Sequence, residues 1–238
     1  MYQNKNGDIE AGRPGQLYPN MMEDPQLRWG FIRKVYAILS VQLLLTVAVC
    51  ALVYCYHPIK IWFKTSPAAL PVYIVGILLP FILMIPLFLY HKKHPLNLVL
   101  LGLFTLAISF MVGLGVSYTK GGIILEAAIL TAVVAVSLTA YTFWAAKRGK
   151  DFSFLGPILF CSVMVLFMFG LIQIFFPLGP LGRMIYGAIG AIIFSGYIVY
   201  DTDNLIKRMS YDEYVLASVS LYLDILNLFL MLLEMLRG

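Results

Sequence analysis

Long apolar segments alternate with short polar segments along almost the whole chain. From residue 31 onward, each apolar run exceeds the roughly 20 residues that a helix needs to cross the hydrocarbon core of a bilayer. The polar segments between the runs are too short to form a domain. The pattern therefore predicts an all-α, polytopic membrane protein with seven transmembrane helices, at Ile32–Tyr56, Ala69–Tyr90, Leu96–Tyr118, Ile123–Ala146, Phe154–Phe176, Met184–Ile206 and Tyr214–Leu236.

The composition agrees with this interpretation. Of the 238 residues, 61% are hydrophobic and only 12% are charged, whereas a soluble domain carries about 25% charged residues. Residues 1–27 are rich in Asn, Gly, Pro and acidic side chains and bury too little apolar surface to order themselves. We predict a disordered cytosolic tail over 1–27 and a single transmembrane domain over 28–238. The first apolar run is too long for a signal-peptide core, so no cleaved signal is expected.

The basic residues indicate how the chain is oriented. Twelve of the 17 Lys and Arg residues fall in the tail, at the start of the first span and in the second, fourth and sixth connecting segments, and five fall on the opposite side. Cytosolic loops of membrane proteins carry the excess of Lys and Arg. The N-terminus is therefore predicted to be cytosolic, and the net charge of +5 marks topology rather than a nucleic-acid partner.

Acidic residues inside the predicted spans are the candidate functional groups. A carboxylate at membrane depth is costly and is functional by default. Asp224 lies near the middle of the seventh span, and Asp201 lies about two turns from the cytosolic end of the sixth. Glu126 is predicted to be an interfacial acid or to line an outer vestibule, and Glu234 to be solvated. We expect Asp203 to point away from Asp201 and to form an interfacial pair with Lys207 at i+4.

Helical phase predicts that the two deep aspartates face each other. Each lies on a stripe of alternating three- and four-residue steps, and small residues on such stripes let helix backbones approach closely in lipid. Their depths differ by only about 5–8 Å at 1.5 Å per residue, a gap that helix tilt can close. The stripes are Gly187, Ala191, Phe194, Ile198, Asp201 and Leu205 on the sixth span, and Ala217, Ser220, Asp224, Asn227, Met231 and Glu234 on the seventh.

The surroundings of the pair limit its chemistry. Neither span has a basic residue near its centre, so the two carboxyl groups must share a proton, bind a metal ion or open onto water. Asn204 and Asn227 each follow an aspartate by three residues and are predicted to donate hydrogen bonds to it. A purely structural hydrogen bond between the helices is the alternative.

Signatures of soluble enzyme classes are absent from the sequence. There is no HExxH, GxSxG, P-loop or zinc-type Cys/His spacing, and we predict no cofactor and no enzymatic activity. One remote alternative is an intramembrane aspartyl protease of the presenilin type, because Tyr200-Asp201 matches its first motif. The second motif, Gly-x-Gly-Asp, is replaced here by Leu221-Tyr222-Leu223-Asp224. A seven-span G-protein-coupled receptor is disfavoured by the predicted cytosolic N-terminus.

Several segments resemble the Bax inhibitor/lifeguard family. They are the stretch from Arg28 to Tyr36, the segment His94-Pro95-Leu96-Asn97, the segment from Tyr197 to Thr202 and the segment from Leu221 to Phe229. The sequence from Tyr141 to Lys147 resembles the plant-type lifeguard branch most. The resemblance implies a seven-helix protein of the endoplasmic reticulum, Golgi, vacuole or plasma membrane. Such proteins restrain cell death and lower stored calcium by a pH-sensitive leak.

The resemblance also assigns roles to the aspartates. It implies that Asp201 and Asp224 form a proton-sensing gate and are possible ligands of the permeant Ca²⁺. Some relatives hold an arginine in span two that pairs with the first aspartate, and span two lacks one here. In our interpretation the protonated pair ties spans six and seven together, and the ionised pair repels and offers oxygen ligands to Ca²⁺. The alternative is a non-conducting scaffold that acts through other cell-death regulatory membrane proteins.

Overall fold

The computed structural model describes residues 15–19 and 21–238. Eight helices and no strand occur in these residues, and every helix except α2 is long and apolar enough to cross a membrane. Each predicted span coincides with one of these seven long helices, so the predicted all-α membrane architecture is confirmed. The helices are α1 Pro25–Cys55, α2 His57–Thr65, α3 Ala69–Tyr90, α4 Leu96–Val116, α5 Gly121–Lys147, α6 Leu155–Phe175, α7 Pro180–Lys207 and α8 Tyr214–Arg237.

The first helix begins earlier than hydropathy predicts. The Asp24 side chain caps α1 by accepting a hydrogen bond from the Gln26 N–H at 2.8 Å, and Pro25 occupies the first turn. Both features favour a helix start, although the turn they begin is polar. Leu17 and Met21, inside the segment predicted as a disordered tail, are buried in the core. The rest of that prediction, for residues 1–14 and 20, lies outside the described residues.

The segment between the first two spans is a helix and not the loop that we predicted. α2 has nine residues and buries none of them fully. Its Ile61 and Trp62 are exposed, and Lys60 Nζ lies 4.2 Å from the centre of the Tyr54 ring. A search for 20-residue apolar runs overlooks such a helix because it is too short to span and mixes apolar with basic residues.

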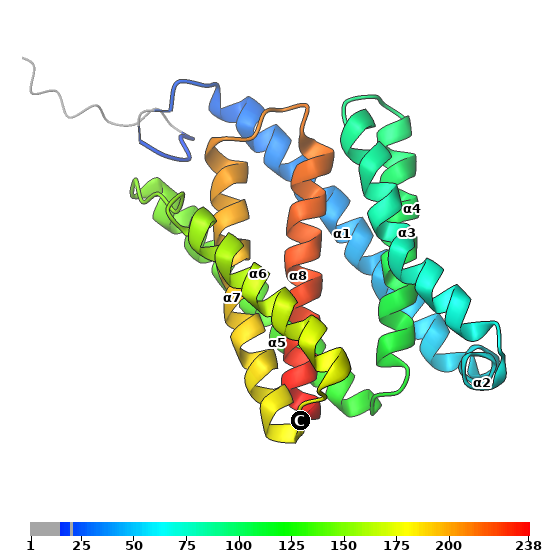
Figure 1. Ribbon diagram of the computed structural model, residues 1–238. Coiled ribbons are helices and arrows are strands. Elements are labelled where there is room, and N and C mark those ends of the chain that lie inside the picture. Colours follow the sequence, from blue (N-terminus) through cyan, green and yellow to red (C-terminus); the bar gives the residue numbers. More distant parts are fainter. Residues whose placement is uncertain (1–14, 20) are drawn as a thin grey trace, which may run out of the picture.

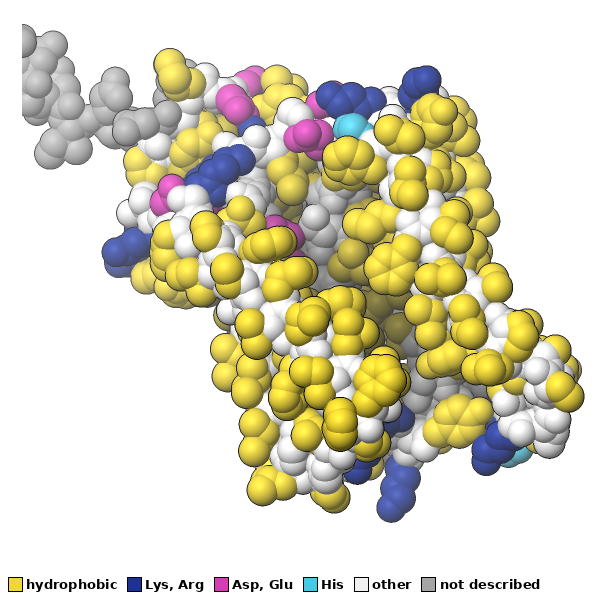
Figure 2. All heavy atoms as spheres, in the orientation of Figure 1, with side chains coloured by type: hydrophobic (Ala, Val, Ile, Leu, Met, Phe, Trp, Pro, Cys, Tyr) yellow, Lys and Arg dark blue, Asp and Glu magenta, His cyan; other side chains and the backbone are white. Residues whose placement is uncertain are grey.

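The helices are arranged around α8, which is the most buried span. α8 packs against α7 and α5 on one side and against α1 and α4 on the other, while α3 packs on α4 and α6 packs on α7 (Figure 1). Since α3 and α6 lie outermost, most of their apolar side chains are exposed. Figure 2 shows hydrophobic side chains over most of the visible face and charged ones gathered at its two ends, as a bilayer requires.

The connecting segments alternate between these ends. The start of α1 and the α3–α4, α5–α6 and α7–α8 connections lie at one end, which we call the N-terminal end (Figure 1). α2, the α4–α5 and α6–α7 connections and the C-terminus lie at the other, which we call the C-terminal end. The acidic side chains visible in Figure 2 lie in the half of the molecule nearer the N-terminal end.

Candidate functional site at the α7–α8 interface

The backbones of α7 and α8 come into direct contact. A Cβ atom placed on Gly187 would lie 2.5 Å from the backbone nitrogen of Met235 and 2.6 Å from the carbonyl oxygen of Met231. No side chain fits at that position without pushing α8 away. The predicted stripe on α7 therefore faces α8: its members Gly187, Ala191, Phe194, Ile198 and Leu205 are buried, as is Gly190 beside it.

This interface brings Asp201 and Asp224 together. The two carboxyl groups are close enough to influence each other's charge, and Asp224 is only 6% exposed. The Oδ2 atom of Asp224 has no hydrogen-bond donor. None of the ion pairs formed by described residues includes either aspartate. Two carboxyl groups in contact, without a cation, are stable only if they hold at least one proton between them.

The predicted supporting residues behave differently from one another. The Asn204 amide oxygen accepts a hydrogen bond from Arg208 at 2.6 Å, and its bond to Asp201 stays a prediction. Asn227 is half-buried and forms no hydrogen bond with Asp224 Oδ2. Glu126 is exposed near the start of α5. It does not join the pair, because α5 begins at the C-terminal end of the molecule whereas Asp201 lies in the last two turns of α7, toward the N-terminal end of the molecule.

Asp203 is paired as predicted but is not at a solvated interface. Its Oδ1 lies 2.5 Å from Lys207 Nζ, and its Oδ2 lies 3.4 Å from an Arg208 nitrogen. Oδ2 also accepts a hydrogen bond from the Phe152 N–H at 3.3 Å, and the side chain is fully buried. The interfacial prediction was wrong about burial because the α5–α6 connection folds over the end of α7, which the sequence of α7 does not reveal.

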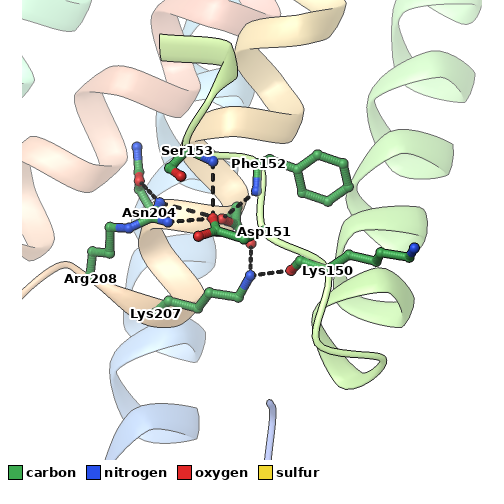
Figure 3. Close-up of polar contacts among 8 residues, drawn as sticks. Lys150, Asp151, Phe152, Ser153, Asn204, Lys207 and Arg208 are labelled. Atoms are coloured by element: carbon green, nitrogen blue, oxygen red, sulfur yellow. Dashed lines mark hydrogen bonds and ion pairs between the residues drawn. The ribbon is translucent and has the colours of Figure 1, made fainter. Parts of the chain in front are cut away.

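That connection and the end of α7 form one polar cluster (Figure 3). Arg208 donates to Asp151 Oδ1 at 2.5 Å and to Asn204 Oδ1 at 2.6 Å, and Lys207 donates to the Lys150 carbonyl. The Ser153 N–H and the Arg208 guanidinium hold the pKa of Asp151 well below its ordinary value. The cluster ties residues 150–153 to α7 within one turn of Asn204.

A second polar group crosses the core on the other side of α8. The Thr46 hydroxyl lies 2.9 Å from both the Tyr222 hydroxyl and the Ser109 hydroxyl. Gln42 donates to Thr105 Oγ1 at 3.1 Å. Sequence reasoning missed this seam, although its signal is present: Gln42 and Thr46, like Thr105 and Ser109, stand four residues apart on helices that pack together. We call these five residues the hydroxyl seam.

Comparison with known proteins shows which family the chain resembles. The family model described as "Inhibitor of apoptosis-promoting Bax1" matches residues 28–238. The chain belongs to the Bax inhibitor family. "Protein LIFEGUARD 4" of Arabidopsis thaliana is 61% identical over 97% of this chain and 95% of its own length. "Protein lifeguard 4" of Mus musculus is 40% identical, and the "Golgi anti-apoptotic protein" of Vaccinia virus (strain Lister) is 39% identical, each over 89% of this chain and 86% of its own length.

The site of this Bax inhibitor family member is not built like a resident metal centre. Among the described residues, no three His, Cys, Asp or Glu side chains gather where they could hold an ion. Ca²⁺ takes six to eight oxygen ligands, so two carboxyl groups offer only a partial shell. Two cavities, of about 500 and 540 Å³, lie at the start of α1 and between α2, α3 and α4, away from the aspartates. The chemistry available at membrane depth is therefore that of the carboxyl pair.

Proposed function

We propose that this protein is a pH-sensitive calcium leak channel that suppresses cell death, with Asp201 and Asp224 as its gate. The observation that carries the proposal is the placement of Asp201 and the buried Asp224 on the packed helices α7 and α8, with no ion pair to either among the described residues. The name of the viral relative, "Golgi anti-apoptotic protein", supports the cell-death role. Seven apolar spans support a place in the membrane.

The physical mechanism follows from the charge of the pair. With one shared proton, a hydrogen bond joins α7 to α8 and the interface is closed. When that proton leaves, two negative charges at contact distance repel strongly in a medium of low dielectric constant. The helices then separate and water enters. The exposed carboxylates attract a hard divalent cation, which passes because two ligands bind it too weakly to hold it.

The shape of the molecule supports access to the interior. Figure 2 shows a hollow between α6 and the α3–α4 pair, with an acidic side chain visible inside it. Proteolysis by the pair is not part of the proposal. α7 and α8 are continuous helices through both aspartates, whereas peptide hydrolysis there requires unwound backbone beside the acids.

Calcium flux in reconstituted vesicles tests the gate. We expect the wild-type leak to change between about pH 5 and 8 and to be smaller at low pH. Asp201→Asn and Asp224→Asn each keep the hydrogen bond but remove the repulsion, so either variant should lose most of the pH dependence. Asp212→Asn, an exposed acid in the α7–α8 connection, is the matched control and should behave as wild type. Wild-type pH dependence in both aspartate variants would contradict the gate and favour the non-conducting scaffold.

We further propose that the N-terminal end is cytosolic in an intracellular or plasma membrane. The tail, the start of α1 and the connections predicted at this end carry twelve of the Lys and Arg residues, which supports the orientation. Protease added to sealed microsomes should then cleave the tail from outside, on the N-terminal side of the buried Leu17. A protected tail would invert the assignment.

A further inference from the structure

Arg208 links the α5–α6 connection to the neighbourhood of Asp201. Its guanidinium donates to Asn204 Oδ1 at 2.6 Å and to Asp151 Oδ1 at 2.5 Å, and it lies 3.4 Å from Asp203 Oδ2 (Figure 3). A planar guanidinium reaches several acceptors at once in a fixed geometry. Because Asp151 is held in turn by the Ser153 N–H at 3.0 Å, the position of Arg208 depends on the connection as well as on α7.

The bond from Arg208 determines which end of the Asn204 amide faces Asp201. An amide has one acceptor oxygen and one donor NH₂ group. The oxygen is taken by Arg208, a donor without any acceptor atom, so the NH₂ group is the end left for Asp201. Asp201 lies three residues earlier on the same face of α7, about one turn deeper, so the Asn204 side chain is its neighbour on that helix. An amide rotated the other way would present its oxygen to a carboxylate and repel it.

We infer that Arg208 is a positioning residue for the gate, which orients the Asn204 amide so that its NH₂ group donates to Asp201. The inference rests on the proposed function, because it assigns the residue that sets the pH at which that gate operates. It also makes the α5–α6 connection part of the gate, since Asp151 anchors the other side of the guanidinium. A change at this end of the molecule is thereby transmitted to the carboxyl pair one turn away.

The direction of the effect follows from what surrounds Asp201. From α8 it meets Asp224, and on α7 the Tyr197 hydroxyl is close to both acids. From α1 the buried Tyr36 hydroxyl and on α7 the buried Thr202 hydroxyl have no hydrogen-bond partner, and the charged residues of α5, Glu126 and Lys147, lie near the ends of that helix. α6 has no charged residue. The Asn204 NH₂ group is therefore the donor that favours the ionised form of Asp201, and loss of its orientation should make the pair bind its proton at higher pH.

Arg208→Gln tests the inference in the full-length protein in vesicles. Two readouts are compared across pH: calcium flux, and modification of Asp201 by a hydrophobic carbodiimide, which reacts with protonated carboxyl groups and is mapped by mass spectrometry. Both midpoints should move upward by about half a pH unit or more. Arg208→Lys should give a similar shift, because an ammonium group cannot bridge Asn204 and Asp151 in the same geometry. Arg208→Lys also keeps the charge that Asp203 requires for folding.

Lys207→Gln is the matched control. Lys207 belongs to the same cluster and pairs with Asp203, but it bonds the Lys150 carbonyl and not Asn204. Its substitution should leave both midpoints within about 0.2 pH units of wild type. Equal shifts in the Lys207 and Arg208 variants, or none in either Arg208 variant, would overturn the inference. A wild-type flux without pH dependence would refute the gate instead, while the carbodiimide midpoints would still decide whether Arg208 positions Asn204.

Discussion

The two polar regions on opposite sides of α8 differ in how well their groups are satisfied. In the hydroxyl seam, which α8 shares with α1 and α4, every polar side chain has a hydrogen-bond partner, and only the Gln42 Oε1 atom is left without one. At the α7–α8 interface, Asp224 Oδ2 has no donor and its nearest polar partner is another acid. The hydroxyl seam consists of neutral groups in which donors pair with acceptors. The α7–α8 interface instead places two acidic groups near each other.

The difference separates a structural region from a candidate gate. Satisfied hydroxyl and amide groups between membrane helices hold those helices together with a modest gain, averaging about 0.6 kcal/mol for each hydrogen bond. An unsatisfied buried carboxyl group lowers stability, so its presence is explained only by a function that needs it. A polar residue in a membrane helix is therefore best judged by its partners and not by its polarity alone.

The largest effect is expected from a substitution that removes the α7–α8 contact itself. The Cβ of Gly187→Ala would overlap the backbone of α8, which cannot rotate away as a side chain does. We expect a loss of about 3 kcal/mol, at the upper end of overpacking effects. Gly102→Ala is the control, since nothing lies within 4 Å of its Cβ position. Thermal unfolding in detergent measures both, and equal stability of the two variants would mean that the helices do not touch at Gly187.

A substitution at the unsatisfied carboxyl group should separate stability from function. Asp224→Leu removes a buried polar atom that has no donor, so stability should stay level or rise by about 1 kcal/mol. The pH response of calcium flux should be lost entirely. Unfolding temperature and flux are measured on the same preparation. A strongly destabilised Asp224→Leu protein would show that the acid holds the helices together, as the hydroxyl seam does.

The opposite outcome is expected in the hydroxyl seam. Thr46→Val keeps the shape of the side chain but leaves the buried Tyr222 hydroxyl without its partner. The loss should be about 1–2 kcal/mol, with the pH midpoint of flux unchanged. Ser40→Ala, which removes an exposed hydroxyl on the same helix, is the control. A shifted flux midpoint in Thr46→Val would extend the gate across α8 and end the distinction between its two sides.

The parts of this structure that sequence reasoning predicted depend on the bilayer or on one helix at a time. Seven spans follow from the thickness of the hydrocarbon core. That the stripes of α7 and α8 face each other follows from helical periodicity, because Gly187 and Ala191 lie on the same face of α7 as Asp201. α2 was not predicted because its nine residues are too few to span a membrane. The start of α1 was not predicted because its first turn is polar.

What sequence reasoning missed depends on contacts between distant segments. Asp203 looks interfacial on α7 alone, and only the fold of residues 150–153 over that helix buries it. From the sequence, Arg208 is only one of the basic residues that indicate topology. In the structure it bonds both Asp151 and Asn204, which joins the α5–α6 connection to α7. The hydroxyl seam requires knowing that α1 packs on α4, which the four-residue spacing on each helix suggests but does not establish.

The smallest effect is expected where polar groups meet water, at the N-terminal end. Glu23 accepts hydrogen bonds from the Tyr211 hydroxyl at 2.7 Å and from the buried Arg28, and these, the Tyr211 bond first, lower the pKa of Glu23. A lowered pKa in the folded state adds stability above the unfolded value of about 4.3, and this is lost as the pH falls through the folded value. The stability difference between wild type and Glu23→Gln should therefore be present at pH 6 and vanish near pH 3.

The size of this difference should be small, because the Glu23 side chain is 41% exposed and water screens its attraction to Arg28. Asp212→Asn is the control: its pair with Lys92 is more than half exposed on both sides, so its substitution should change the unfolding temperature even less. Thermal unfolding of the three proteins at pH 3 and pH 6 measures both differences. If the Glu23→Gln difference persisted at pH 3, the Tyr211 and Arg28 contacts would be stabilising through packing and not through charge. The solvated end would then resemble the hydroxyl seam, in which neutral groups provide the stability.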